Sequence, residues 1–138
     1  MHRAISCLIV AGLLTGCQTA TGPLPGGVIL TPSKTTYVPG EVVTAVVSNR
    51  SSSQIDTGAC SLRAERHNRD QWELVGPEGV PCTLQLLLIS ANSDRTLRLT
   101  VPTPLTPGEY RLRFSYLLAG TNAAQAAYSS PITVQGAN

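Results

Sequence analysis

Residues 109–115 read EYRLRFS and carry the most regular alternation of apolar and polar side chains in the chain. Tyr110, Leu112 and Phe114 occupy every second position, and Arg111 and Arg113 lie between them. Successive side chains of a β-strand point to opposite faces, so this pattern predicts a strand with one buried and one solvated face. We expect this strand to extend to residue 118.

The same period of two recurs in shorter segments that precede this strand. The expected inward-facing sets are Val43, Ala45 and Val47; Cys60, Leu62 and Ala64; and Leu97, Leu99 and Val101. Turn-forming residues separate them, since Pro39 and Gly40 fit the centre of a type II turn and residues 67–70 (HNRD) fit a hairpin turn. From residue 28 onward, no convincing apolar pattern has helical spacing. Seven or eight short strands in a chain of this length predict an all-β, antiparallel sandwich.

Other segments give less regular patterns. Residues 28–37 read as a broken first strand. Residues 82–89 contain the run LLLI, which is typical of a strand covered on both faces or of a segment that crosses between sheets. Residues 123–127 are compatible with a loop or a short helical turn. Residues 128–134 predict a last strand, which Pro131 places at a sheet edge or a bulge.

The N-terminus has the order of a secretory signal, with Arg3 near the start, an apolar segment at 4–14 and a small residue before Cys17. The apolar segment is too short to span a bilayer. The sequence LTGC at 14–17 resembles the lipobox of bacterial lipoproteins, whose precursors are cleaved before a cysteine that has received a diacylglycerol. The resemblance implies that residues 1–16 are a signal peptide and that Cys17 is lipidated. An ordinary signal cleaved nearby and an uncleaved hydrophobic leader are the alternatives.

Residues 17–27 are rich in glycine, proline and polar residues and are expected to form a flexible tether after the lipidated cysteine. Residues 28–138 then have a usual size for one domain. In lipoproteins of Gram-negative bacteria, aspartate after the cysteine usually marks retention in the inner membrane. By that resemblance, Gln18 favours the outer membrane. The expected location is the bacterial cell envelope, with the domain anchored by lipid and facing the periplasm.

Three motifs resemble the bacterial immunoglobulin-like domains of exported envelope proteins. They are KTTYVPGE at 34–41 with Asn49 after the next strand, Trp72 after a polar turn, and LTPGEYRL at 105–112. The resemblance covers about residues 30–134 and implies an immunoglobulin-like β-sandwich, although such domains serve many unrelated functions. Tyr110 also resembles the tyrosine corner of sandwich folds; an ordinary core aromatic is the alternative.

The four cysteines separate by position. Cys7 lies in the expected leader and Cys17 is the expected lipid acceptor, which leaves Cys60 and Cys82 in the domain. Two remaining cysteines in an exported protein usually form a disulfide, and two separate buried thiols are the alternative. Cys82 follows a proline-containing loop, whereas antibody domains carry both cysteines on core strands. The resemblance therefore does not imply an antibody-type bridge.

The sequence contains no motif that predicts catalysis. It lacks GxSxG, a P-loop and GxGxxG, and the one histidine after the leader, His67, is expected in an exposed hairpin turn. Without CxxC or further ligands at suitable spacing, no metal site is expected. The formal net charge of +2 gives no electrostatic signal of nucleic-acid binding. We therefore expect a non-catalytic protein without cofactors, although a small hydrolase is a third hypothesis.

Arg63, Arg111 and Arg113 are expected on the outward faces of two strands that an immunoglobulin-like topology could make neighbours, with Glu65 beside Arg63. One interpretation is a solvated face with cross-strand charge pairs, each contributing about 0.2–1 kcal/mol. The other is a docking face for an envelope protein. The expected function is thus a lipid-anchored binding or structural module, and an inhibitor or accessory lipoprotein of an envelope enzyme or secretion machine is the alternative.

Overall fold

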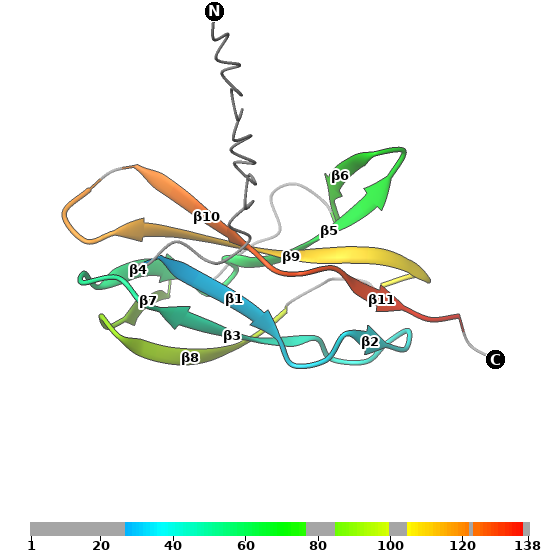
Figure 1. Cartoon of the computed structure of the whole chain (residues 1–138), viewed down its shortest axis with the longest axis horizontal. Helices are drawn as coiled ribbons and strands as arrows, with labels where there is room; N and C mark the ends of the chain where they lie inside the picture. Colours follow the sequence, from blue (N-terminus) through cyan, green and yellow to red (C-terminus); the bar gives the residue numbers. More distant parts are fainter. Residues whose placement is uncertain (1–26, 77–84, 100–104, 122, 137–138) are drawn as a thin grey trace, which may run out of the picture.

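The computed structural model of the chain describes residues 27–76, 85–99, 105–121 and 123–136. In these residues the regular structure consists of eleven β-strands in two sheets, which form the two layers of a sandwich (Figure 1). The first sheet has the order β1 (Val28–Pro32), β3 (Thr44–Asn49) and β8 (Ser93–Arg98). The prediction of an all-β sandwich is confirmed.

The second sheet is built around the longest strand, β9 (Gly108–Leu118). One edge of β9 pairs with β10 (Ala124–Tyr128) and β11 (Ile132–Val134), and the other with β5 (Leu62–Asn68) and β4 (Ile55–Gly58). Three further strands extend this arrangement: β6 (Gln71–Leu74) pairs with β5, β7 (Leu86–Ile89) with β4, and β2 (Thr36–Tyr37) with β11. The β2–β11 pair is parallel, and the other strand pairs in the described ranges are antiparallel.

The count of eleven strands exceeds the predicted seven or eight because three strands are interrupted. β1 and β2, β4 and β5, and β10 and β11 are consecutive pieces of chain, and the last two pairs each follow one edge of β9. Pro131 lies in the break between β10 and β11, where it removes no ladder hydrogen bond. The broken first strand at 28–37 was predicted, whereas the break between β4 and β5 was not.

The predicted inward-facing sets form much of the core between the sheets. Tyr110, Leu112 and Phe114 on β9 are at most 1% exposed, and Ala45 and Val47 on β3 are fully buried. The alternation of residues 109–115 therefore reports burial as predicted. The Tyr110 hydroxyl donates a hydrogen bond of 2.7 Å to the carbonyl oxygen of Thr106, four residues earlier, which is the hydrogen bond expected of a tyrosine corner.

A buried asparagine, Asn49, links the end of β3 in the first sheet to the end of β7 in the second. Asn49 at the end of β3 has no exposed surface, and its Nδ2 donates to the carbonyl oxygens of Ser53, Ile89 and Ser90 at 2.8, 3.2 and 3.0 Å. Its Oδ1 accepts a hydrogen bond from the Ser51 hydroxyl at 2.6 Å. A buried amide must be satisfied in this way, because an unpaired polar group costs about 1–3 kcal/mol.

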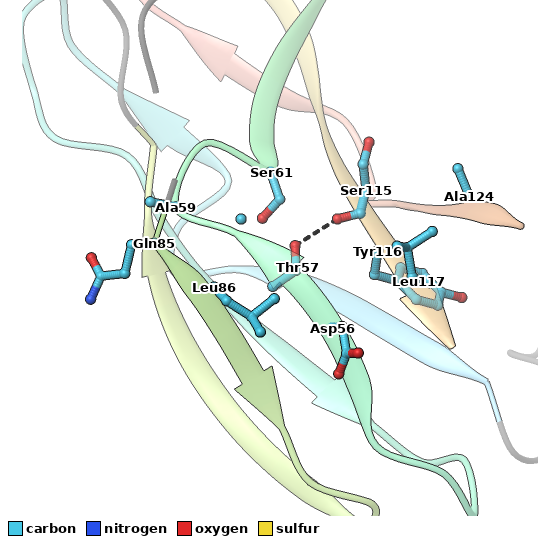
Figure 2. A pocket seen from close by; sticks show the side chains of 11 residues that line it. Asp56, Thr57, Ala59, Ser61, Gln85, Leu86, Ser115, Tyr116, Leu117 and Ala124 are labelled. Carbon is cyan, nitrogen blue, oxygen red and sulfur yellow. Dashed lines mark hydrogen bonds between the residues drawn. The ribbon is translucent and has the colours of Figure 1, made fainter. Parts of the chain in front are cut away.

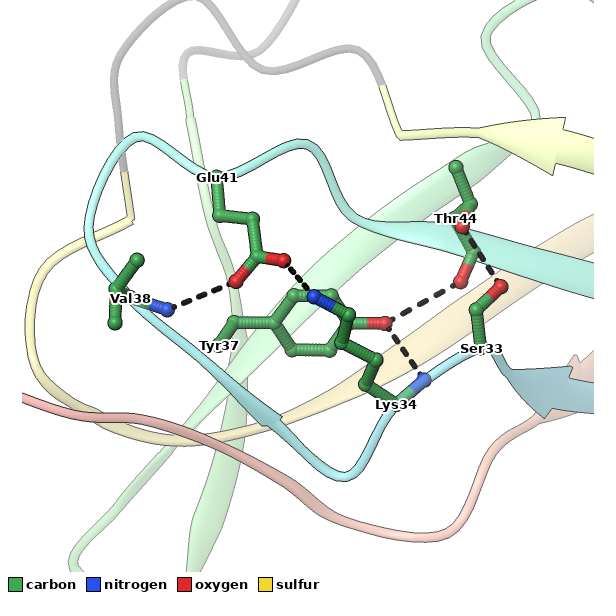
Figure 3. Close-up of polar contacts among 6 residues, drawn as sticks. All are labelled: Ser33, Lys34, Tyr37, Val38, Glu41 and Thr44. Atoms are coloured by element: carbon green, nitrogen blue, oxygen red, sulfur yellow. Dashed lines mark hydrogen bonds and ion pairs between the residues drawn. The ribbon is translucent and has the colours of Figure 1, made fainter.

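The turn at residues 38–41, which lies in the region drawn in Figure 3, has the predicted type II features. The Glu41 amide donates to the Val38 carbonyl oxygen at 3.1 Å, and Gly40 has the positive φ of 82° that this turn requires. The Glu41 carboxylate accepts hydrogen bonds from the Lys34 ammonium and from the Val38 amide (Figure 3). The hydrogen bond from Lys34, followed by that from Val38, lowers the pKa of Glu41, and the same ion pair raises the pKa of Lys34.

The structure corrects the predictions for residues 86–89 and 123–127. Leu86 and Leu88 are 64% and 49% exposed, so β7 is not covered on both faces. It is the terminal strand in the described order of the second sheet, and Ile89 is its one fully buried residue. Residues 124–128 form β10 instead of a loop or helical turn, because β9 offers them an edge to pair with.

The hairpin turn predicted at 67–70 is confined to two residues. Arg69 and Asp70 both have positive φ values, 45° and 66°, as a type I′ turn requires. His67 therefore lies on β5, opposite Trp72 of β6, and is exposed as predicted. The β5–β6 hairpin extends outward from the body of the sandwich (Figure 1).

Candidate functional site

The side of the second sheet that points away from the core carries all three predicted arginines, and we call this side the outer face. Residues directly opposite one another in a ladder share a face. The register therefore places residues of β9 and their cross-strand neighbours together on the outer face. They are Arg111 with Glu65 and Leu74; Arg113 with Arg63 and Tyr128; Ser115 with Ala126; and Leu117 with Ala124, Asp56 and Leu88. Leu86 joins them, since it is two residues before Leu88.

Exposed apolar side chains gather on this face. Seven large hydrophobic residues are exposed in the described part of the chain, and five of them lie on the outer face: Leu74, Leu86, Leu88, Leu117 and Tyr128. The other two, Val38 and Val42, lie at the turn shown in Figure 3 and beside it. A concentration of exposed apolar side chains on one face is a usual mark of an interaction site.

Arg111 is held between two aromatic rings. Its guanidinium carbon lies 4.7 Å from the ring centroid of Trp72 on β6 and 4.3 Å from that of Tyr128 on β10. We call Trp72, Arg111 and Tyr128 the arginine stack. Cation–π contacts of this kind contribute about 0.5–1 kcal/mol each at exposed sites and more where water is excluded.

Glu65 holds the guanidinium of Arg111 in the arginine stack through its carboxylate. Its Oε2 accepts a hydrogen bond of 2.7 Å from Nε of Arg111 and lies 2.6 Å from Nη2 of the same guanidinium, while its Oε1 lies 3.8 Å from Nη1 of Arg113. Glu65 is only 6% exposed. The predicted cross-strand charge pairing is confirmed, but the prediction that Glu65 is solvated is wrong, because the neighbouring arginines cover it. Arg111 is likewise bound within the protein instead of projecting freely.

His67 and Glu109 extend the arginine stack toward the hairpin. The rings of His67 and Trp72 have centroids 4.8 Å apart, and Nδ1 of His67 lies 3.2 Å from Oε2 of Glu109. Both side chains are substantially exposed.

In the described ranges, no group of three or more His, Cys, Asp or Glu residues is placed to hold a metal ion. Those ranges also contain no helix that is long and apolar enough to cross a membrane.

The other end of the outer face is hollowed, as Figure 2 shows. A cavity of about 470 Å³ lies between β4 and β7 on one side and β9 and β10 on the other. Small residues line much of it, namely Gly58, Ala59, Ser61, Ser115 and Ala124. Leu86, Tyr116 and Leu117 provide larger apolar walls, and Asp56, Thr57 and Gln85 complete the lining. We call this cavity the hollow.

The hollow results from the unpredicted break between β4 and β5. The chain leaves the ladder with β9 after Asp56 and re-enters it at Leu62, so part of β9 lacks a continuous neighbouring strand. Two hydrogen bonds connect the chain to Ser115 of β9 across this break. The Thr57 hydroxyl donates to the Ser115 carbonyl oxygen at 2.7 Å (Figure 2), and the Ser115 amide donates to the Ser61 carbonyl oxygen at 3.0 Å. Tyr116 packs against the core, and this burial raises the pKa of its hydroxyl.

The predicted cysteine sites are only partly within the described residues. Cys60 is half-buried in the turn between β4 and β5, next to the hollow-lining Ala59 and Ser61. Cys17 and Cys82 lie outside the described residues. Lipidation at Cys17 and the Cys60–Cys82 disulfide therefore stay predictions.

The pattern of the sequence does not reveal the aromatic partners of Arg111 or the hollow. Tyr128 faces outward together with Ala124 and Ala126. This period-two set can be recognised in the sequence only when residues 124–128 are assigned to a strand. Placing Trp72 on the outer face requires the register of the β5–β6 hairpin, which depends on the turn residues Arg69 and Asp70.

Comparisons with known proteins leave the family open. No protein-family model matches the chain, and no curated protein matches it. Among solved structures it is similar to Spo0M, a sporulation control protein from Bacillus subtilis, with 18% sequence identity and a TM-score of 0.41. The similarity covers 79% of this chain and 49% of Spo0M, so the chain spans about half the length of that protein.

Proposed function

We propose that this protein is a lipid-anchored, non-catalytic, immunoglobulin-like binding module of the bacterial cell envelope, and that it binds an envelope protein through the outer face. The arginine stack is the observation that carries the proposal. Tryptophan, tyrosine and arginine are the residue types most enriched in binding hot spots. Here Glu65 and the two rings fix the arginine in advance, so little side-chain freedom remains to be lost on binding.

The sequence supports the envelope part of this proposal. The lipobox-like LTGC at 14–17 makes Cys17 the lipid acceptor, and Gln18 favours the outer membrane. An oxidising compartment would also suit a disulfide between Cys60 and Cys82. Mass spectrometry of the mature N-terminus tests the first point, since a diacylated Cys17 is expected and an unmodified N-terminus elsewhere contradicts it. Free-thiol labelling of unreduced, denatured protein tests the second, since neither Cys60 nor Cys82 should react.

Capture from envelope extracts tests the binding function. Tyr128→Ala removes a 47% exposed ring of the arginine stack, so it should reduce capture of the partner without unfolding the domain. Val42→Ala is the matched control, because Val42 is 52% exposed but lies outside the outer face. Equal capture by wild type and Tyr128→Ala would contradict a role for the arginine stack. Identifying the partner also decides whether the protein is an inhibitor or accessory lipoprotein of an envelope enzyme or secretion machine.

Reversal of the arginine charges is a poor test of binding. Arg111→Glu would place a second carboxylate against the buried Glu65, and the expected loss of folding would be indistinguishable from a loss of binding. The exposed ring of Tyr128 avoids this problem.

A further inference from the structure

We propose that the hollow receives an apolar side chain from an extended segment of the partner protein, with an acidic residue of that segment on the Arg113 side and a basic residue on the Asp56 side. The inference rests on the proposed function, because it names the chemistry that the outer face recognises. It adds a second binding element next to the arginine stack.

The apolar part follows from the lining of the hollow. Its walls include Leu86, which is 64% exposed, and Leu117, which is 38% exposed, and several lining residues are small (Figure 2). Pockets for small molecules usually enclose most of the ligand surface. The hollow instead lies on the open face of a sheet, so an occupant must bring its own cover. A protein segment does so, because the rest of the partner lies over it.

The acidic residue follows from the charge at one end of the hollow. Arg113 is two residues before the hollow-lining Ser115 and lies directly opposite Arg63 on β5. Glu65 directs Oε2 to Arg111, and its Oε1 remains 3.8 Å from Arg113 Nη1. Nε of Arg113 is buried and makes no hydrogen bond within the described part of the chain. A carboxylate from the partner would complete the neutralisation of Arg113, whose side chain is 40% exposed.

The basic residue follows from the opposite end. Asp56 lines the hollow and lies opposite both Leu117 and Leu88 on the outer face. Its Oδ1 accepts a hydrogen bond of 3.0 Å from Nε2 of Gln54, which orients the carboxylate. Arg113 and Leu117 are four residues apart on β9, or about 13 Å at the rise of a strand. The segment should therefore carry its acidic and basic residues about four positions apart, with the apolar residue between them.

A displayed peptide library tests this inference. Random peptides of about twelve residues are selected on the full chain, and enriched peptides are synthesised for fluorescence anisotropy. We expect enrichment of an apolar residue flanked by an acidic residue and a basic residue. Ser115→Trp, which fills the hollow, should weaken binding of these peptides by roughly tenfold or more. A failure to enrich peptides, a consensus without these residues, or equal binding to Ser115→Trp would overturn the inference.

A charge cycle tests the orientation of the segment. Arg113→Gln should weaken binding of the selected peptides by roughly tenfold, and so should an amide in place of the acidic residue of the peptide. Combined, the two changes should cost little more than either alone. The same pattern is expected when Asp56→Asn is combined with a neutral residue in place of the basic residue of the peptide. Additive losses would show that these charges do not meet and would overturn the assignment. Circular dichroism of each variant checks folding.

Separate readouts distinguish the failure of this inference from that of the proposed function. If Tyr128→Ala abolishes capture from envelope extracts and Ser115→Trp leaves it unchanged, the arginine stack binds the partner and the hollow does not. Two other occupants have their own readouts, namely self-association in sedimentation velocity and co-sedimentation with phosphatidylglycerol vesicles. Loss of either signal in Ser115→Trp would assign the hollow to a second copy or to lipid, and would overturn the inference.

Discussion

The two ends of the outer face are built on the same strand, β9, but differ in how its neighbours continue. At the arginine stack, β6, β5, β9 and β10 form an uninterrupted ladder, and their side chains cover one another until Glu65 is nearly inaccessible. At the hollow, the break between β4 and β5 removes that cover, and Leu86 and Leu117 remain exposed. The comparison shows that alternation assigns a face, while continuity of the neighbouring strands decides whether that face is closed or open.

Removing the carboxylate under the arginine stack should have the largest effect on this comparison. Glu65→Ala leaves the Arg111 guanidinium partly buried without its counter-ion, and we expect a loss of about 2–4 kcal/mol in the free energy of unfolding. Urea denaturation measures it. The control is Glu65→Leu combined with Arg111→Met, which replaces the pair by apolar groups and should recover most of the loss. A loss below about 0.5 kcal/mol for Glu65→Ala would show that the pair is effectively solvated.

Removing the ring at the hairpin should have an intermediate effect. Trp72→Ala deletes contacts with both Arg111 and His67, and we expect a loss of about 1–2 kcal/mol in the free energy of unfolding. Tyr128→Ala should cost less, because that ring is 47% exposed. The reverse order in thermal or urea denaturation would mean that β10, not the β5–β6 hairpin, stabilises the arginine stack.

The same difference explains what the sequence could and could not predict. Local alternation was sufficient for the core positions of β3 and β9, because the period of two depends only on the strand itself. Glu65 has the polar character of an outward position, and only its contacts across β9 reveal that it is buried. The run LLLI suggested cover on both faces, but cover depends on which strands lie alongside, and β7 lies at the end of the described sheet order. Spacing within one segment carries no information about such neighbours.

Substitution in the wall of the hollow should scarcely change stability. Leu86→Ser removes a side chain that is 64% exposed, so we expect a change within about 0.5 kcal/mol in the free energy of unfolding. Ile89→Ser on the same strand is the matched control, because Ile89 is 2% exposed and its loss should cost several times more. If Leu86→Ser were as destabilising as Ile89→Ser, the hollow would be part of the folded core and not an open site.

Alkaline titration should give the smallest effect and reports on Tyr116, which lines the hollow and also packs against the core. Burial disfavours the phenolate of Tyr116 and raises its pKa above the ordinary value of 10.0. The folded state therefore retains this proton more tightly than the unfolded state, so the associated stability is complete below pH 10.0 and is lost as the pH rises through the folded pKa. Between about pH 9 and pH 11, the urea midpoint of wild type should fall slightly more than that of Tyr116→Phe. Equal midpoint shifts for the two proteins would show that the Tyr116 hydroxyl is in ordinary contact with solvent.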